Sequence, residues 1–244
     1  MIVALIPCRL ESKRLKHKAL LKIENITIIE HVIKRAQLCK YIDQIAVCTN
    51  SNLIIKLVQN LKIKTFKSKI KHNNGTERIA EFPLPKKVKF VIDIQGDEPL
   101  FDPRSLNELI NFHKNNSQYD IVIPSTKLAK GDNKNEVKII SNDKGKILYL
   151  TRSNSPYEFK KKNKFYQKHL SVISFKPKAL KKFYKLRKSK LEKIEGIELL
   201  RALENNFKLG TFISNFSSQA VDVKEDYLKA IKLMKKDKIK NLYK

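Results

Sequence analysis

The sequence predicts an α/β protein in which helices cover both faces of a mostly parallel, twisted sheet. Short apolar runs alternate with stretches whose apolar residues recur at helical spacing, and the first run, residues 2–7, is apolar throughout, as in a parallel strand buried on both faces. The chain has 244 residues, of which 41% are hydrophobic and 31% charged, a globular composition. Since no repeat or Gly/Ser-rich linker divides the chain, we expect one domain over residues 1–244.

The first half of the chain contains strand–helix units. The expected strands cover residues 2–7, 44–49 and 88–94, and the expected helices cover residues 28–36, 53–61 and 106–112. In each helical segment the apolar residues recur three or four positions apart, which predicts one buried face.

The second half is less regular. Strands are expected at residues 121–125, 137–140, 147–150 and 170–175, and helices at residues 191–203 and 227–234. Lys144-Gly145 suits a hairpin turn between two of these strands. The basic segment 159–168 is expected to form a mobile loop.

The charge of the chain favours anionic partners. Lys and Arg number 52 against 24 Asp and Glu, a formal net charge of +28. Because lysine is spread through the whole chain, a lysine bias on solvated faces explains this charge better than a dedicated nucleic-acid surface. A basic RNA- or DNA-binding protein remains a remote alternative, but the aromatic residues fall mainly at core periodicities rather than among the cations.

Cysteine usage and hydropathy indicate a cytoplasmic protein without membrane insertion. The chain has an odd number of cysteines, Cys8, Cys39 and Cys48, and no two of them have C-x-x-C spacing. Neither a disulfide framework nor a zinc site is therefore expected. No apolar run approaches the roughly 18 residues of a spanning helix. The apolar residues 1–6 have no basic segment before them, which argues against a signal peptide.

A cluster of cations follows the first expected strand. It consists of Arg9, Lys13, Arg14, Lys16 and Lys18, and ligands of open α/β sheets bind beyond the carboxyl ends of the strands. Arg and Lys in this position can hold a polyphosphate, although a solvated basic loop is an alternative. The loop lacks the glycines of dinucleotide-binding and Walker motifs.

Three polar segments are further candidates. Residues 95–99, Gln-Gly-Asp-Glu-Pro, follow an expected strand, and Asp222 follows a short apolar run. Such carboxylates can coordinate Mg²⁺, but an acidic turn and a helix N-cap are the alternatives. Residues 73–78, Asn-Asn-Gly-Thr-Glu-Arg, could equally be a turn and an N-cap.

The order and spacing of these and other motifs resemble the 3-deoxy-manno-octulosonate cytidylyltransferase (CMP-Kdo synthetase) family from end to end. The matching segments are I-P-C-R-L-E-S-K-R-L-K-H-K-A-L at 6–20, N-N-G-T-E-R-I-A-E at 73–81, I-Q-G-D-E-P-L at 94–100, N-E-V-K-I-I at 135–140, L-Y-L-T-R-S-N-S-P-Y at 148–157, K-H-L-S-V at 168–172, L-E-K-I-E-G-I-E-L-L-R at 191–201 and V-D-V-K-E-D-Y at 221–227. The resemblance implies a Rossmann-like nucleotide-diphospho-sugar transferase fold.

Several positions depart from the family pattern. Lys16 and His17 replace the Pro-Gly of its phosphate loop, which raises the alternative of an inactive member. Ser171 and Ile173 replace a Gly and a Tyr on the sugar-side strand. N-acylneuraminate, legionaminate and 8-amino-Kdo are therefore alternative sugar substrates.

The resemblance implies transfer of CMP from CTP to the anomeric hydroxyl of 3-deoxy-D-manno-octulosonate (Kdo). The products are CMP-Kdo, for lipopolysaccharide synthesis, and pyrophosphate. A homodimer formed through a subregion at about residues 135–215 is implied as well. The implied catalytic residues are Arg9, Lys18, Asp97 and Asp222, and the two aspartates hold Mg²⁺. The implied nucleotide-binding residues are Pro7, Cys8, Arg9, Arg14, Lys18, Gly75 and Arg78. The implied sugar-binding residues are Gln95, Arg152, His169 and Glu195.

Overall fold

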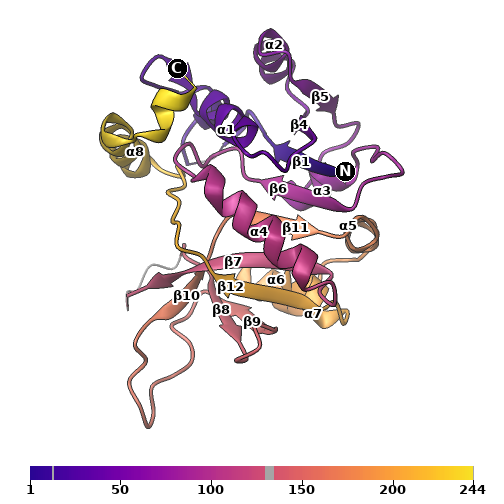
Figure 1. The fold of residues 1–244 in the computed structure, drawn as a ribbon, viewed down its shortest axis with the longest axis vertical. Coiled ribbons are helices and arrows are strands. Elements are labelled where there is room, and N and C mark those ends of the chain that lie inside the picture. Colours follow the sequence, from indigo (N-terminus) through magenta and orange to yellow (C-terminus); the bar gives the residue numbers. More distant parts are fainter. Residues whose placement is uncertain (13, 130–134, 244) are drawn as a thin grey trace.

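The centre of the molecule is one continuous sheet (Figure 1). A computed structural model describes residues 1–12, 14–129 and 135–243. In this part of the chain the sheet has ten strands: β1 (Ile2–Pro7), β4 (Gln44–Thr49), β5 (Lys64–Lys67), β6 (Phe90–Ile94), β7 (Ile121–Leu128), β8 (Lys138–Ser141), β9 (Ile147–Thr151), β10 (Tyr166–His169), β11 (Val172–Phe175) and β12 (Leu209–Ile213). Their order is β5-β4-β1-β6-β11-β7-β10-β8-β9, and β12 pairs with β7.

The strands from β5 to β6 are parallel, and β1 lies between β4 and β6. Every residue of β1 is buried, because its side chains alternate between two apolar layers. Val3 and Leu5 face one layer, whereas Ala4 and Ile6 face the other. The predicted α/β class is thereby confirmed, including the strand buried on both faces.

Helices cover both faces of the sheet. One face packs against α1 (Ile28–Gln37), α2 (Asn52–Asn60) and α4 (Pro103–Asn115). The other packs against α3 (Gly75–Ala80), α5 (Pro177–Tyr184), α6 (Lys190–Glu195) and α7 (Leu200–Glu204). A small sheet of β2 (Lys22–Ile23) and β3 (Ile26–Thr27) lies beside α8 (Lys224–Lys236), and the short 3₁₀ helices are η1 (Lys18–Leu20) and η2 (Ile239–Leu242).

The second half of the chain extends the sheet with mainly antiparallel strands. Strand β11 pairs antiparallel with β6 and β7, and β10 pairs antiparallel with β7 and β8. Strands β8 and β9 form the predicted hairpin, in which Gly145 adopts a φ of 76°. Strand β12 pairs parallel with β7.

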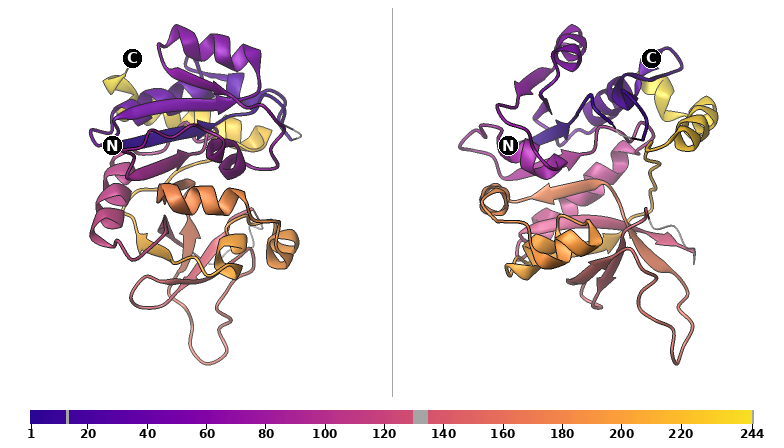
Figure 2. Two further views of the ribbon diagram at one scale, coloured as in Figure 1. Left: turned by 90° about the vertical axis from the view of Figure 1, so that its right-hand side faces the viewer. Right: turned by 180° about the vertical axis from the view of Figure 1, so that it is seen from behind.

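Two predicted elements were wrong. The single helix expected at residues 191–203 is two helices, α6 and α7, because Gly196 adopts a left-handed φ of 65° and ends α6. The basic segment 159–168 is only partly a loop, since β10 occupies its end. Pairing with strands on both sides outweighs the basic composition there. The remaining loop between β9 and β10 projects from the body of the molecule (Figure 2).

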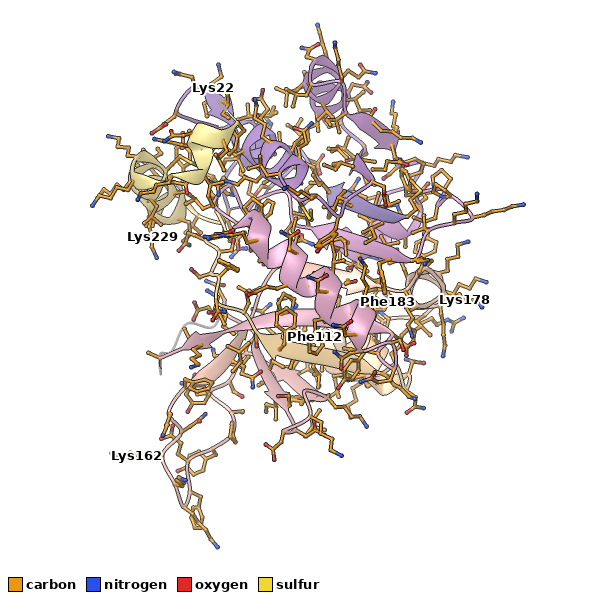
Figure 3. All side chains as sticks on the ribbon, viewed as in Figure 1. Lys22, Phe112, Lys162, Lys178, Phe183 and Lys229 are labelled. Atoms are coloured by element: carbon orange, nitrogen blue, oxygen red, sulfur yellow. The ribbon has the colours of Figure 1, made fainter. Side chains whose placement is uncertain are left out.

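Lysine side chains point outward from all parts of the molecule. Figure 3 labels Lys22, Lys162, Lys178 and Lys229, which lie on well-separated elements and loops. This distribution fits a lysine bias on solvated faces better than one basic patch. None of the described helices combines the length and apolarity needed to cross a bilayer.

Candidate active site

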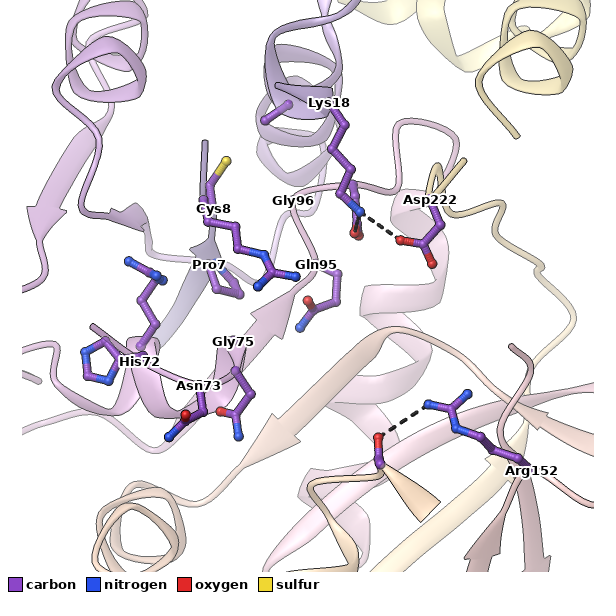
Figure 4. Close-up of a pocket in the computed structure, with 16 residues that line it drawn as sticks. Pro7, Cys8, Lys18, His72, Asn73, Gly75, Gln95, Gly96, Arg152 and Asp222 are labelled. Carbon is purple, nitrogen blue, oxygen red and sulfur yellow. Dashed lines mark hydrogen bonds and ion pairs between the residues drawn. The ribbon is translucent and has the colours of Figure 1, made fainter. Parts of the chain in front are cut away.

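A cavity of about 440 Å³ opens at the carboxyl ends of β1 and β6 (Figure 4). This edge of a parallel sheet is where α/β proteins bind their ligands. The cavity is lined by Pro7, Cys8, Arg9, Lys18, Ala19, His72, Asn73, Asn74, Gly75, Arg78, Gln95, Gly96, Asp97, Arg152, Gly196 and Asp222. Most residues singled out from the sequence therefore meet in one place.

Lys18 connects the two aspartates of the cavity. Its Nζ lies 2.5 Å from Asp97 Oδ2 and 2.9 Å from Asp222 Oδ1, and only 11% of its side chain is exposed. Burial by itself lowers the pKa of Lys18, but the two carboxylates outweigh that effect and raise it. The ammonium group stays charged, and the two carboxylates converge on one point.

Arg14 extends this cluster at the rim of the cavity. Its Nη2 lies 3.0 Å from Asp222 Oδ1, and half of its side chain is exposed. Burial would raise the pKa of Asp222, but Lys18 and Arg14 lower it, so Asp222 is ionised at neutral pH. Arg9 lines the same cavity. The cluster thus combines cations that can hold a polyphosphate with carboxylates that can hold a metal ion.

Glycines allow the backbone on the opposite wall to pack closely. A Cβ on Gly75 would lie 3.0 Å from Pro7 Cγ and 3.3 Å from Gln95 Nε2. A Cβ on Gly96 would lie 3.0 Å from the carbonyl oxygen of Pro7. Larger residues would push these segments apart, so both glycines keep the wall of the cavity in shape.

Cys8 and Arg78 lie in the deep part of this wall. Burial, with the nearby charge of Asp97, raises the pKa of the Cys8 thiol to about 12. A thiol in that state is not a nucleophile at neutral pH, so Cys8 has a packing role. The Arg78 guanidinium is buried and donates hydrogen bonds to Asn50 Oδ1 (3.3 Å) and Ser68 Oγ (3.5 Å).

Arg152 reaches the cavity from the second half of the chain. Its Nε donates to the carbonyl oxygen of Glu195 at 2.8 Å, and its backbone N–H donates to Glu195 Oε2 at 3.0 Å. Figure 4 shows its guanidinium bonded to the carbonyl of Gly196. Glu195 does not line the cavity itself, so the structure places it as the residue that orients Arg152.

His169 lies at the end of β10 and is not among the residues lining the cavity. Burial lowers its pKa to about 4, so the imidazole is neutral at physiological pH. Its contact with a sugar remains a prediction.

The sequence reasoning missed several lining residues, His72 and Gly196 among them. His72 directly precedes the Asn-Asn-Gly-Thr-Glu-Arg motif, and its Nε2 lies 2.7 Å from Glu81 Oε2. This position beside the motif could have identified His72 as a cavity residue from the sequence. Gly196 had no local signal, because only the break between α6 and α7 brings it to the cavity.

An α/β sheet with cations and paired carboxylates at its carboxyl edge is suited to binding a nucleotide polyphosphate and transferring its phosphoryl group, as nucleotidyltransferases do. A family model described as cytidylyltransferase matches residues 3–212, and the chain belongs to this family. The 3-deoxy-manno-octulosonate cytidylyltransferase of Thermodesulfovibrio yellowstonii is 34% identical over 92% of this chain and 94% of its own length. That of Rickettsia canadensis is 35% identical over 95% of both chains.

A solved structure has the same fold over nearly its whole length. It is the CMP:2-keto-3-deoxy-manno-octonic acid synthetase complexed with CTP, with a TM-score of 0.91 and 26% identity. The match covers 96% of this chain and 98% of that one. The resemblance seen in the motifs is therefore confirmed by sequence and by fold.

Proposed function

We propose that this protein transfers CMP from CTP to the anomeric hydroxyl of Kdo, with release of pyrophosphate. The product, CMP-Kdo, would serve lipopolysaccharide synthesis. The observation that carries the proposal is the convergence of Lys18, Asp97 and Asp222 in a cavity that Arg152 enters from the opposite side. Relatives bearing the name of this activity match nearly the full length of the chain.

In the proposed reaction the sugar hydroxyl attacks the α-phosphorus in line, and pyrophosphate leaves. Arg9, Arg14 and Lys18 hold the triphosphate and stabilise the charge that develops on the leaving group. The wall formed by Pro7, Cys8, Gly75 and Arg78 surrounds the cytidine, largely through backbone groups. Catalysis then consists of positioning and charge stabilisation, with no covalent intermediate on the protein.

Gln95 and Arg152 lie on the sugar side of the cavity in this proposal. The fixed guanidinium of Arg152 can take the sugar carboxylate as a bidentate partner. The guanidinium donates from Nε to the carbonyl oxygen of Glu195 and from Nη2 to that of Gly196, and these bonds hold it in place and reduce the entropy lost on binding.

The donor set of the cavity fits Mg²⁺. The carboxylates of Asp97 and Asp222 both lie beside Lys18 Nζ, so a metal ion that they hold together would lie next to this ammonium group. No group of three or more His, Cys, Asp or Glu side chains suited to a metal occurs among the described residues, so the substrate would supply further ligands. Mg²⁺ is commonly held by one or two carboxylates together with water and substrate phosphates. When bound, it would neutralise the α-phosphate and lower the pKa of the attacking hydroxyl.

A pyrophosphate-release assay with CTP, Mg²⁺ and Kdo tests the proposal. We expect turnover with Kdo, and a matched panel of 8-amino-Kdo, N-acetylneuraminate and legionaminate identifies the preferred sugar. Preference for a nine-carbon acid would change the substrate but keep the reaction class. Absence of pyrophosphate release with every sugar, from protein that binds Mg–CTP, would point to the inactive member that Lys16 and His17 suggest.

Two further properties belong to this proposal. We place the enzyme in the cytoplasm, where its three buried free thiols stay reduced. We also expect a homodimer formed through residues from about 135 to 215. Light scattering of the purified protein measures the mass directly, and a monomer of 28.4 kDa at micromolar concentration would contradict the dimer.

A further inference from the structure

Behind the cavity, three side chains form a hydrogen-bonded chain. Thr76 Oγ1 lies 2.6 Å from Glu198 Oε1 and 3.4 Å from Asp93 Oδ2. On its other side Asp93 Oδ1 accepts a hydrogen bond of 3.1 Å from Gln95 Nε2. Asp93 and Thr76 are completely buried. The second oxygen of Glu198, Oε2, is also buried and has no hydrogen-bond partner among the described residues.

The hydroxyl of Thr76 can satisfy only one of the two carboxyl groups beside it. A hydroxyl carries one hydrogen, and an ionised carboxylate carries none. If Asp93 and Glu198 were both ionised, Thr76 would donate its hydrogen to Glu198 at 2.6 Å. Asp93, 3.4 Å from the hydroxyl, would then be a completely buried carboxylate whose one close hydrogen-bond donor among the described residues is the neutral amide of Gln95. A proton on one carboxyl removes the conflict, because that carboxyl donates to Thr76 while Thr76 donates to the other.

The groups facing Asp93 favour such a proton. Burial is the largest effect on Asp93 and raises its pKa well above the usual range. The neighbouring carboxylates of Glu198 and Asp97 raise it further, whereas the hydrogen bonds from Thr76 and Gln95 act in the opposite direction. Cys48, from β4 on the far side of β1, is a buried thiol and brings no charge.

The groups facing Glu198 do not supply a free cation. Burial raises the pKa of Glu198 most, and the hydrogen bond from Thr76 and the charge of Arg201 on α7 lower it. Glu77 on α3 and Glu192 on α6 raise it further. The Arg201 Nη2 already donates to Glu77 Oε1 at 3.0 Å and to Glu192 Oε1 at 2.7 Å. Its charge is therefore engaged by two carboxylates.

We propose that Asp93 and Glu198 share one proton through Thr76, and that this proton makes the three side chains positioning residues for Gln95 and the first turn of α3. The inference concerns the cavity itself, and its role in sugar binding rests on the proposed function. Asp93 holds the Gln95 amide, and Thr76 follows Gly75, so the shared proton ties two walls of the cavity to the turn that precedes α7.

The pair makes the protein sensitive to alkaline pH. Burial raises the pKa of Glu198 to about 7 from the usual 4.5. Since the folded-state value is the higher one, the stabilisation is fully present below pH 4.5 and is lost as the pH rises through 7. For a single carboxyl with these two values, the folding equilibrium constant falls about tenfold between pH 6 and pH 8.5.

The test compares the wild type with Glu198→Gln and Asp93→Asn by urea unfolding and infrared spectroscopy at pH 6 and pH 8.5. In each variant the N–H of the new side-chain amide can donate a hydrogen bond to Thr76, so no bound proton is needed there. We expect the wild type at pH 6 to show the carbonyl band of a protonated carboxyl, and both variants to lack it. The folding constants of both variants should fall about tenfold less than that of the wild type between the two pH values.

Asp143→Asn is the matched control, because Asp143 is exposed in the turn between β8 and β9. It should keep the infrared band and the pH dependence of the wild type. A wild type without that band, or variants with unchanged pH dependence, would overturn the shared proton. Either isosteric variant alone decides the point, so a folding defect in one leaves the other as the test.

The role of the pair in positioning is read from the KM for the sugar. It should rise above pH 7 in the wild type and stay constant in Asp93→Asn, and parallel profiles would refute the positioning role. These outcomes are separate from the proposed function. If no sugar is turned over, the proposed function fails while the spectroscopic and unfolding results still decide the shared proton.

Discussion

Replacing Asp97 by asparagine tests the assignment of the cavity carboxylates most directly. Asp97 Oδ2 and Asp222 Oδ1 lie 2.5 and 2.9 Å from the same Lys18 Nζ. Asparagine keeps the shape of the side chain but removes the charge that would hold Mg²⁺ at the reacting phosphate. We expect kcat to fall by about 10²-fold or more, which corresponds to at least about 2.7 kcal/mol of transition-state stabilisation.

The fold should survive this substitution. The Asp97 side chain is 28% exposed, so solvent screens its ion pair, and the loss of stability should not exceed about 1 kcal/mol. The backbone hydrogen bond from Val221 N to the Asp97 carbonyl, 2.9 Å long, is unchanged by the substitution. Urea unfolding checks the stability, and pyrophosphate release from CTP and Kdo under saturating Mg²⁺ checks the rate.

Asp102→Asn is the matched control. Asp102 lies close to Asp97 in the sequence but is the N-cap of α4, where its Oδ1 accepts a hydrogen bond from Arg104 N at 2.8 Å. Asparagine caps helices as well as aspartate does, so this variant should keep both fold and rate. Near-normal turnover by a folded Asp97→Asn protein would refute the metal assignment and the reasoning behind it.

Three further predictions follow from the same features. Calorimetry should show Mg–CTP binding more tightly than Mg–ATP or Mg–GTP, because a close-packed pyrimidine pocket excludes purines and penalises unpaired polar groups. Arg201→Met should lower the free energy of unfolding by about 3–5 kcal/mol in urea titrations, because it leaves Glu77 and Glu192 as unpaired buried charges. RNA binding measured on filters should weaken steeply between about 50 and 200 mM KCl, since diffuse lysines bind through counterion release. Mg–CTP binding should persist over that range, because its cations converge in one cavity.

Each of these predictions has a contrary result. Equal affinity for ATP would contradict the pyrimidine pocket, and an Arg201→Met protein as stable as the wild type would show that the buried ion pairs add nothing. Salt-resistant, sequence-selective RNA binding without a saturable CTP site would replace the enzyme with a nucleic-acid-binding protein.

The sequence by itself determined the layered half of the fold. Short apolar runs and apolar residues three or four positions apart are local properties of the sequence. They identified β1, β4 and the helices that follow the parallel strands. The motifs likewise identified the chemistry of the cavity. The residue types in a motif and the spacing between them can be read from the sequence without knowledge of the tertiary structure. Lys18, Asp97 and Asp222 were all found in this way.

Only the tertiary structure decided which of these side chains meet. Lys18 bonds to partners 79 and 204 positions away along the chain, and that contact depends on strand order, which no local pattern encodes. Arg152 and His169 belong to equally clear motifs, yet only Arg152 lines the cavity. The buried contact of Asp93 with Glu198 through Thr76 joins strand β6, helix α3 and the turn before α7. Long-range packing alone creates it, because burial and charge act through space rather than along the sequence.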